Sequence, residues 1–280
     1  MISYKVDYHH HSTGSDGHQT PHAVVVQALK DRVTHLCFTD HYPRPEETQD
    51  SYWKGQDVLY HNAKYVAEVA KLQREYKGKI DIRFGAELDW LEGYEDWMKK
   101  VIASNKFDYV LGSVHVMKVG NEWTSIDANR QVWEEIAGKL GGVEKFIQEY
   151  YRQRRLQIQS GLFDCVGHLD YIKLYNRQGD LFSEESSNYR AEVMMTLNEL
   201  KKSKSAVEIN TSGWRKAEEQ FPSTWILQYM AKLGIPITIG SDGHGLVAED
   251  YLDRAHQLAR DAGFKSVLVF KNRKPIEVRI

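Results

Sequence analysis

Short apolar runs alternate with longer amphipathic stretches along the chain, and each apolar run has the length of a β-strand. The seven main runs predict strands at Ile2–Tyr8, Thr34–Thr39, Ile80–Glu87, Tyr109–Val114, Phe163–Gly167, Ala206–Asn210 and Ile235–Gly240. A further run near the carboxyl end, Ser266–Phe270, predicts a shorter eighth strand.

The stretches between these runs carry apolar residues at helical spacing. Thr20 followed by Pro21 is a typical helix start, because threonine caps the first turn and proline fits the first helical position. Ser183 and Ser223 are expected to cap later helices in the same way. The predicted helices are Pro21–Asp31, Val58–Tyr76, Asp127–Ser160 with an interruption near Gly138, Gly141 and Gly142, Ser183–Ser203, Ser223–Leu233 and Glu249–Ala262.

This repeated order of strand and helix predicts parallel βαβ units in an α/β fold. Seven units favour a closed barrel, although an open, doubly wound sheet would give much the same pattern. A barrel of this kind typically has about 250 residues in one domain. No repeat, low-complexity tract or linker divides the chain, so residues 1–280 are expected to form a single domain.

The charge balance favours a small substrate over a polymer. The formal net charge is −2, from 37 basic and 39 acidic residues, whereas a protein that binds nucleic acid usually has a basic excess or a basic stripe. The two cysteines, Cys37 and Cys165, lie in apolar runs and predict buried thiols in a reducing compartment. No signal peptide or membrane-spanning run is apparent, so we expect a cytoplasmic protein without a membrane partner.

Half of the twelve histidines stand directly after a predicted strand. They follow five of the seven strands, and the third strand ends in Glu87 instead. Because barrel enzymes build their sites from loops at the carboxyl ends of the strands, these side chains would meet in one mouth. The six histidines are His9, His11, His41, His115, His168 and His244.

Two further carboxylates, Asp16 and Asp242, lie in the first and last of these loops. Imidazole and carboxylate are ligands that suit Zn²⁺, Mn²⁺ or Fe²⁺. Six imidazoles and three carboxylates are too many for one ion, so the count predicts two or three metals. His18 lies beside Asp16 and is the alternative ligand from that loop. A single histidine at a strand end is more often structural, and only the recurrence of the pattern favours a metal site.

These motifs resemble those of the polymerase and histidinol phosphatase (PHP) family, and they span residues 9 to 244. Within that family, the stretches 207–216 and 234–238, with Pro222 between them, are most similar to the L-histidinol-phosphate phosphatases. The matching motifs are His9-x-His11, Ser15-Asp16-Gly17, Thr39-Asp40-His41, Gly85-Ala86-Glu87, Gly112-Ser113-Val114-His115, Gly167-His168-Leu169-Asp170 and Gly240-Ser241-Asp242-Gly243-His244.

The resemblance implies a distorted, TIM-like barrel of seven βα units that binds three divalent ions, with zinc, manganese and iron all usable. It also implies how the ligands are divided, with Glu87 bridging two metals. The first metal would be held by His9, His11, Glu87 and Asp242, the second by Glu87, His115 and His168, and the third by Asp16, His41 and His244.

The activity implied by the resemblance is hydrolysis of L-histidinol phosphate to L-histidinol and inorganic phosphate in histidine biosynthesis. A hydroxide shared by two metals would attack phosphorus, and Asp242 or His41 would supply the proton for the leaving alkoxide. The phosphate also favours a guanidinium partner. Arg215 is the first candidate and Arg177 the second, and for each the alternative is a solvated loop charge.

Two other functions compete with this one. The same site could act on another small phosphate ester or on a short oligonucleotide, which a basic strip leading to the mouth would favour. The chain could also be a metal-binding domain without catalysis, which a missing ligand would favour. All nine ligand positions are filled. The sequence does not indicate the oligomeric state.

Overall fold

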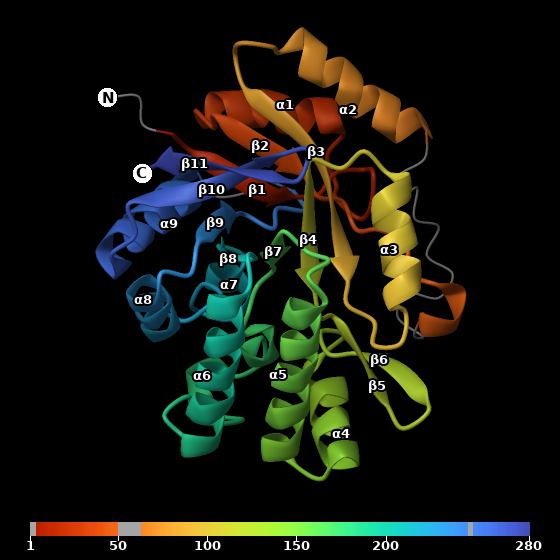
Figure 1. Ribbon diagram of the computed structural model, residues 1–280, viewed down its shortest axis with the longest axis vertical. Coiled ribbons are helices and arrows are strands. Elements are labelled where there is room, and N and C mark those ends of the chain that lie inside the picture. Colours follow the sequence, from red (N-terminus) through yellow and green to blue (C-terminus); the bar gives the residue numbers. More distant parts are fainter. Residues whose placement is uncertain (1–3, 50–62, 246–248) are drawn as a thin grey trace.

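Seven parallel strands form the central sheet of the computed structural model, which describes residues 4–49, 63–245 and 249–280 (Figure 1). Each strand pairs in parallel with its neighbours in the sheet, so the predicted βαβ arrangement is confirmed. The order is β1 (Val6–His10), β2 (His35–Phe38), β3 (Asp81–Asp89), β4 (Tyr109–Ser113), β7 (Cys165–Val166), β8 (Ala206–Asn210) and β9 (Ile237–Gly240).

The sheet closes into a distorted barrel where the first and last strands end. The backbone N–H of Asp242 donates to the carbonyl of His9 at 2.8 Å, and the N–H of His11 donates to the carbonyl of Gly243 at 2.9 Å. A parallel bridge joins His10 to Gly243. An open sheet is therefore excluded, and the closure lies at the end of the barrel where the predicted site residues are.

The predicted helices are present, with ends that differ by a few residues. The side chain of Thr20 caps α1 by accepting from the N–H of Ala23, and Gly141 ends α4 at a φ of 93°. Residues 58–62 of the helix predicted at Val58–Tyr76 lie outside the described residues. The helices are α1 (Pro21–Lys30), α2 (Ala63–Glu75), α4 (Arg130–Leu140), α5 (Val143–Ser160), α6 (Ser187–Lys202), α8 (Thr224–Leu233) and α9 (Glu249–Ala262).

Helix α3 (Glu95–Ser104) and the short α7 (Gly213–Lys216) were not predicted, nor were the 3₁₀ turns. The side chain that caps α6 is Ser186 and not Ser183. Ser223 precedes α8 without a side-chain capping bond, because its hydroxyl bonds to Asp170 and Glu184 instead. The 3₁₀ turns are η1 (Glu46–Thr48), η2 (Tyr171–Lys173) and η3 (Arg177–Gly179).

Two antiparallel hairpins lie outside the barrel sheet. One pairs β5 (Val116–Val119) with β6 (Glu122–Ser125), immediately after β4. The other pairs β10 (Ser266–Lys271) with β11 (Lys274–Arg279). The run Ser266–Phe270 therefore forms a strand, but this strand does not continue the barrel as an eighth member.

The β10–β11 hairpin covers the amino-terminal end of the barrel (Figure 1). The hydroxyl of Tyr8 in β1 donates to the carbonyl of Phe270 at 2.9 Å, and the ring of Tyr109 in β4 lies 5.0 Å from that of Phe270. The N–H of Asn272 at the hairpin turn donates to Asp108, just before β4. Buried aromatic rings therefore fill the barrel below the mouth.

Both cysteines, Cys37 and Cys165, are buried free thiols, as predicted. Among the described helices, none combines the length and the apolar character needed to cross a membrane.

His256 of α9 supports the seam between β1 and β9. Its Nε2 accepts a hydrogen bond from the backbone N–H of Val6 at 3.1 Å, which requires an unprotonated nitrogen. Burial lowers the pKa of His256 to about 4. The unfolded chain, with an ordinary histidine pKa of about 6.5, therefore binds more protons than the folded chain between these values. The stability that the neutral ring contributes is present above pH 6.5 and is lost as the pH falls towards 4.

We expect His256→Gln to make the protein less sensitive to acid, because the glutamine oxygen can accept the same bond without taking up a proton. Between pH 7 and pH 5, the wild type should lose about 2 kcal/mol more unfolding free energy than the variant. Urea unfolding of both proteins, each loaded with metal, measures this difference. Equal losses in the two proteins would show that His256 is not a neutral acceptor.

Candidate metal and active site

The carboxylate of Glu87 lies at the centre of the predicted histidines. Strand β3 carries it to the mouth of the barrel, where it is 2% exposed. Its Oε1 lies 3.0 Å from His168 Nε2 and 3.5 Å from His115 Nε2. Its Oε2 lies 3.2 Å from His9 Nε2 and 3.3 Å from His11 Nε2. The two oxygens therefore face two separate pairs of imidazoles, which is the placement that a bridging ligand requires.

Asp242, in the turn after β9, faces the first of these pairs. Its Oδ1 lies 3.5 Å from His11 Nε2 and 3.8 Å from His9 Nε2. Its Oδ2 accepts from the hydroxyl of Ser212 at 2.8 Å and from Lys216 Nζ at 3.3 Å. One carboxylate oxygen is thus directed at the imidazoles, and the other is held by donors from the α7 region.

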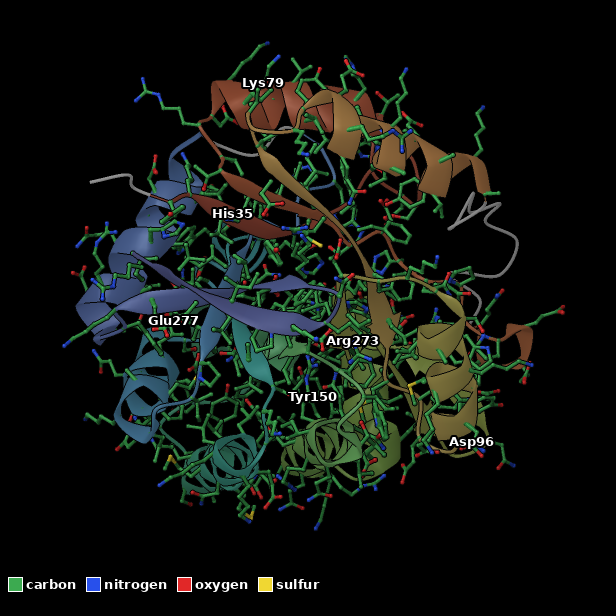
Figure 2. The ribbon with its side chains drawn as sticks, turned by 45° about the horizontal axis from the view of Figure 1, so that its top comes forward. His35, Lys79, Asp96, Tyr150, Arg273 and Glu277 are labelled. Atoms are coloured by element: carbon green, nitrogen blue, oxygen red, sulfur yellow. The ribbon has the colours of Figure 1, made fainter. Side chains whose placement is uncertain are left out.

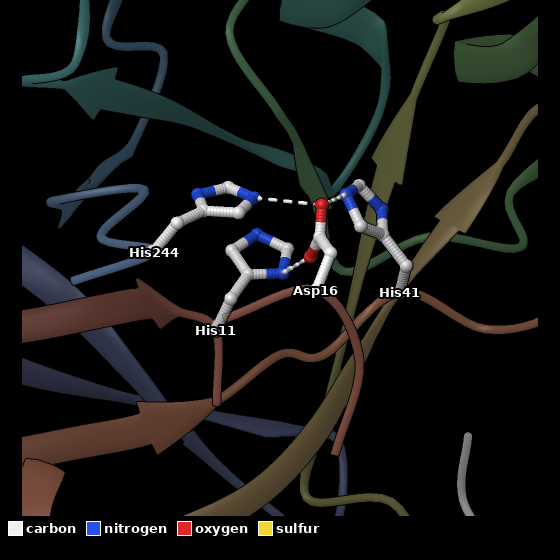
Figure 3. Close-up of side chains that lie close together, drawn as sticks. All are labelled: His11, Asp16, His41 and His244. Atoms are coloured by element: carbon white, nitrogen blue, oxygen red, sulfur yellow. Dashed lines mark ion pairs between the residues drawn. The ribbon is translucent and has the colours of Figure 1, made fainter. Parts of the chain in front are cut away.

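A third group of imidazoles lies around Asp16 (Figure 3). Its Oδ2 lies 3.3 Å from His244 Nε2 and 3.8 Å from His41 Nε2, and its Oδ1 lies 3.6 Å from His11 Nδ1. His41 also reaches Glu87, with its Nδ1 3.1 Å from Oε2. His18 also lines the mouth, but its side chain is exposed, whereas Asp16 lies within the group of donor atoms formed with His11, His41 and His244.

The first loop owes its shape to Asp40. The carboxylate of Asp40 accepts from the backbone N–H of Ser12 at 2.7 Å, from the hydroxyl of Ser15 at 2.7 Å, and from the hydroxyl of Tyr65 in α2. These bonds fold the loop back over the end of β2 and place Asp16 beside His41. The motif residue next to His41 therefore holds the first loop in place through a backbone N–H and side-chain hydroxyl groups.

The imidazoles have the surroundings of metal ligands. His9 Nε2 and His11 Nε2 are 3.0 Å apart, and His115 Nε2 and His168 Nε2 are 3.1 Å apart, so each pair converges on one point. In two of these imidazoles a carboxylate occupies the opposite nitrogen: Glu208 lies 2.7 Å from His9 Nδ1, and Asp89 lies 2.9 Å from His115 Nδ1.

Carboxylates that orient metal-binding imidazoles in this way are typical of metal sites. Among the described residues, three groups have donor atoms that all lie within 4.8 Å of one another. These are His11, Asp16, His41 and His244; His9, His11 and Asp242; and His41, Glu87 and His115. The donor set therefore fits divalent ions, and all nine predicted ligand residues converge in the mouth.

The site concentrates opposite charges. Burial opposes the ionisation of Glu87, but the charges of His9 and His115 hold the pKa of Glu87 well below its usual range. Burial also disfavours a charge on His115, yet Glu87 and Asp89 raise its pKa to about 9. Burial itself lowers the pKa of His41 to about 4 and that of His168 to about 3. Imidazoles compensate the carboxylates here, and cations that bind to the same atoms would displace the protons.

The backbone is unusual at two of the predicted ligands. His168 has a φ of 31° and Asp242 a φ of 50°, both in the left-handed region that residues with a Cβ rarely adopt. Gly240 is needed for a different reason, since a Cβ at this position would lie 2.2 Å from Glu208 Oε1 and 2.4 Å from His9 Cβ. Only glycine leaves room for Glu208 to reach His9.

A pocket of about 680 Å³ opens above the cluster. Asp127, which follows the β5–β6 hairpin, is half-buried in its wall, and its buried Oδ1 has no hydrogen-bond partner among the described residues. Lys216 brings a positive charge to the same wall. The remaining lining is largely aromatic and aliphatic, from Tyr171, Leu174 and Tyr175.

Neither of the predicted arginines lines this pocket. The side chain of Arg215 is exposed, and exposed Arg177 donates to the backbone carbonyl of Lys216 at 3.4 Å. The pocket is lined instead by Lys216, the residue after Arg215 on α7, whose Nζ lies 3.3 Å from Asp242 Oδ2. The positions of Asp89 and Asp127 near the site were also not predicted from the sequence. The position of Asp89, two residues after Glu87 on the same face of a strand, was a usable signal.

Comparison with known proteins agrees with this arrangement. Residues 7–212 match the family described as "PHP domain". The chain belongs to the PHP domain family. The sequence-based assignment to this family is thereby confirmed, and the distorted seven-stranded barrel of the present PHP chain is consistent with it.

The PHP chain is similar to proteins of known name over almost its entire length. It is 34% identical to a protein of Deinococcus radiodurans named "probable histidinol-phosphatase", over 94% of this chain and 93% of that protein. It is 27% identical to histidinol phosphate phosphatase of Lactococcus lactis, whose crystal structure contains zinc, L-histidinol and phosphate. That comparison gives a TM-score of 0.76 and covers 97% of this chain and 98% of the other.

A Listeria monocytogenes protein supports the fold alone, at 22% identity and a TM-score of 0.80, over 85% of this chain and 95% of that protein.

We expect Asp89→Asn to weaken metal binding by roughly tenfold to a hundredfold, because the variant loses the charge that orients His115. Asp96→Asn is the matched control, since Asp96 lies on the surface of α3 and is 98% exposed. Metal content per chain, measured after dialysis against increasing chelator, should fall earlier in Asp89→Asn only. Identical curves for the wild type and Asp89→Asn would rule out this role of Asp89.

Proposed function

We propose that this PHP chain hydrolyses L-histidinol phosphate to L-histidinol and inorganic phosphate in histidine biosynthesis, as a metal-dependent phosphoric monoester hydrolase. The observation that carries the proposal is the composition of the mouth. Three groups of potential metal ligands form its floor, and Lys216 and Asp127, whose Oδ1 has no hydrogen-bond partner among the described residues, stand in its wall. This matches a substrate with a phosphate at one end and cationic nitrogens at the other. The similarity to the Deinococcus and Lactococcus proteins supports the same substrate.

We assign the metal ligands according to the oxygen or nitrogen that each side chain directs into the mouth. Bound ions, whether zinc, manganese or iron, would lower the pKa of water and neutralise the phosphate oxygens. Glu87 would be shared by the first two metal positions, because its two oxygens face different imidazole pairs. The sets are His9, His11, Glu87 and Asp242; Glu87, His115 and His168; and Asp16, His41 and His244.

The protein groups near the reacting phosphate have distinct roles. Lys216 Nζ lies beside Asp242 Oδ2 and adds a positive charge where the phosphate oxygens would lie. Although burial opposes it, Lys216 and the histidines hold the pKa of Asp242 well below its usual range, so this residue is a carboxylate at neutral pH. Burial likewise keeps His41 neutral. Asp242 and His41 can therefore accept a proton from the attacking water and return it to the leaving oxygen, but neither begins as an acid.

The organic end of the substrate would lie against Asp127. Burial raises the pKa of Asp127, and a cationic imidazole or ammonium group would supply the partner that its Oδ1 lacks. Tyr171 and Tyr175 offer rings to a flat heterocycle. A carboxylate in this place would select substrates whose organic group is cationic, and it would not recognise the phosphate.

We further propose that the enzyme acts in the cytoplasm, as one domain of residues 1–280. Two buried free thiols are compatible with a reducing compartment. The mouth has one lysine and no arginine among its described lining residues, which does not favour an oligonucleotide substrate.

The direct test is phosphate release by the metal-loaded protein from L-histidinol phosphate, compared with other monoesters and a diester. We expect two to three metals per chain and a clear preference for L-histidinol phosphate. A preference for another monoester would refute the substrate, while the metal-dependent chemistry would stand. If no phosphate is released after reconstitution with zinc, manganese or iron, the proposal fails altogether.

A second prediction concerns the organic end of the substrate. We expect Asp127→Asn to lower kcat/KM for L-histidinol phosphate by roughly tenfold to a hundredfold, because a charge-assisted hydrogen bond is lost. Hydrolysis of p-nitrophenyl phosphate, which has no cation, should change by less than about threefold, within the usual scatter of such effects. An equal loss on both substrates would place Asp127 in the chemistry or in folding instead of recognition.

A further inference from the structure

A second and larger cavity lies at the end of the barrel opposite to the mouth. Its volume is about 1000 Å³, and it is bounded by α2, the first residues of β2 and β3, the loop after α3 and the turn between β10 and β11. Figure 2 turns this end towards the viewer, with His35 at the start of β2 and Lys79 before β3. None of the residues of the proposed active site lines this cavity.

The ionisable groups that line the cavity are mostly cationic. Burial lowers the pKa of His35, which is therefore neutral at pH 7. The five basic residues outnumber the two acidic ones, although the whole chain has a net charge of −2. The basic residues are Lys77, Lys79, Arg83, Lys106 and Lys271, and the acidic residues are Asp81 and Asp108.

Both acidic groups already have partners. Asp81 accepts from Arg83 Nη2 at 2.6 Å. The two oxygens of Asp108 accept backbone N–H groups, from Phe84 at 3.3 Å and from Asn272 at 2.9 Å. These bonds direct the carboxylates at the protein, so they compensate the remaining cations of the cavity only weakly.

Of the five cations, only Arg83 pairs with a carboxylate of the described residues, through its Nη2 and Asp81. Arg83 Nε is buried and has no hydrogen-bond partner among the described residues. No ion pair joins any of the four lysines to a carboxylate in the described part of the chain. The lysines come from three separate segments, before β3, after α3 and at the β10–β11 turn. A concave surface with uncompensated charge of one sign attracts ligands of the opposite sign.

The walls between these charges are apolar. Val66 and Ala70 of α2 face the cavity together with Ile80, Ile82 and Phe84 from the start of β3. A free inorganic anion would leave this surface exposed to water, whereas a ligand with a flat or apolar body would cover it. The volume is at the upper end of the range for small-molecule sites.

We propose that this cavity binds an organic anion with an apolar body and a phosphate group, of the size of a nucleoside monophosphate. The site is separate from the mouth, because β3 places Arg83 at the cavity and Glu87 at the mouth, roughly 13 Å apart along the strand. The buried rings of Tyr8, Tyr109 and Phe270 fill the interior of the barrel between the two ends. The inference goes beyond the proposed phosphatase activity and does not depend on it.

The test is calorimetric titration of the metal-loaded protein with adenosine 5′-monophosphate. We expect one site per chain that persists in the mouth variant Glu87→Gln. The double variant Lys106→Glu/Lys271→Glu should bind at least about tenfold more weakly, since two attractive charges become repulsive. The matched control is Lys100→Glu/Lys201→Glu, which changes the net charge equally at exposed positions outside the cavity and should bind as the wild type does.

Phosphatase activity separates this proposal from the previous one. Lys106 and Lys271 lie outside the mouth, so their double variant should keep wild-type activity, which also shows that it folds. Should it fail to fold, Lys106→Gln/Lys271→Gln replaces it, with a smaller expected loss of binding. The proposal is overturned if the nucleotide does not bind at millimolar concentration, if both double variants weaken binding equally, or if only Glu87→Gln abolishes it.

Discussion

The buried carboxylate of Glu87 is the constraint around which the mouth is built. A charge that is 2% exposed is costly unless positive charges or N–H donors surround it, and here imidazoles from four different barrel strands or their following loops supply them. The same need explains why His9 and His115 have carboxylates behind them, since each imidazole must present one nitrogen to the centre and anchor the other. The cluster is thus a network in which each group is oriented by another.

Such a network requires the two ends of the sheet to meet. The bonds between His9 and Asp242 and between His11 and Gly243 close the barrel at its mouth, and they bring the loops after the first and last strands together. The left-handed backbone at His168 and Asp242 is strain that the surrounding structure must overcome. Below the mouth, where no proposed ligands converge, side chains such as His256 and the β10–β11 hairpin close the barrel.

The sequence predicted the barrel and the meeting of the nine proposed ligand residues well, because parallel strands place all their carboxyl ends together whatever the loops do. The sequence-based prediction failed where the direction of a side chain depends on its angular position on a helix or on the course of a short local segment. Arg215 and Lys216 are neighbours in sequence, but about 100° separates them on α7, and only Lys216 faces the mouth. Asp127 was placed at the start of a helix, whereas the unpredicted β5–β6 hairpin carries it into the pocket wall.

The distribution of charge between the two ends of the barrel has a consequence for binding. Without metals, the described mouth lining holds four carboxylates, Asp16, Glu87, Asp127 and Asp242, against one lysine. Protonated histidines offset these carboxylates, but the positive charge of the histidines is paired with carboxylates within the cluster and is not available to a phosphate dianion. Divalent ions would reverse the balance, because each brings two positive charges and replaces protons on the same nitrogens. Phosphate recognition at the mouth is therefore conditional on metal, whereas the lysines at the opposite end offer a positive surface that no metal has to create.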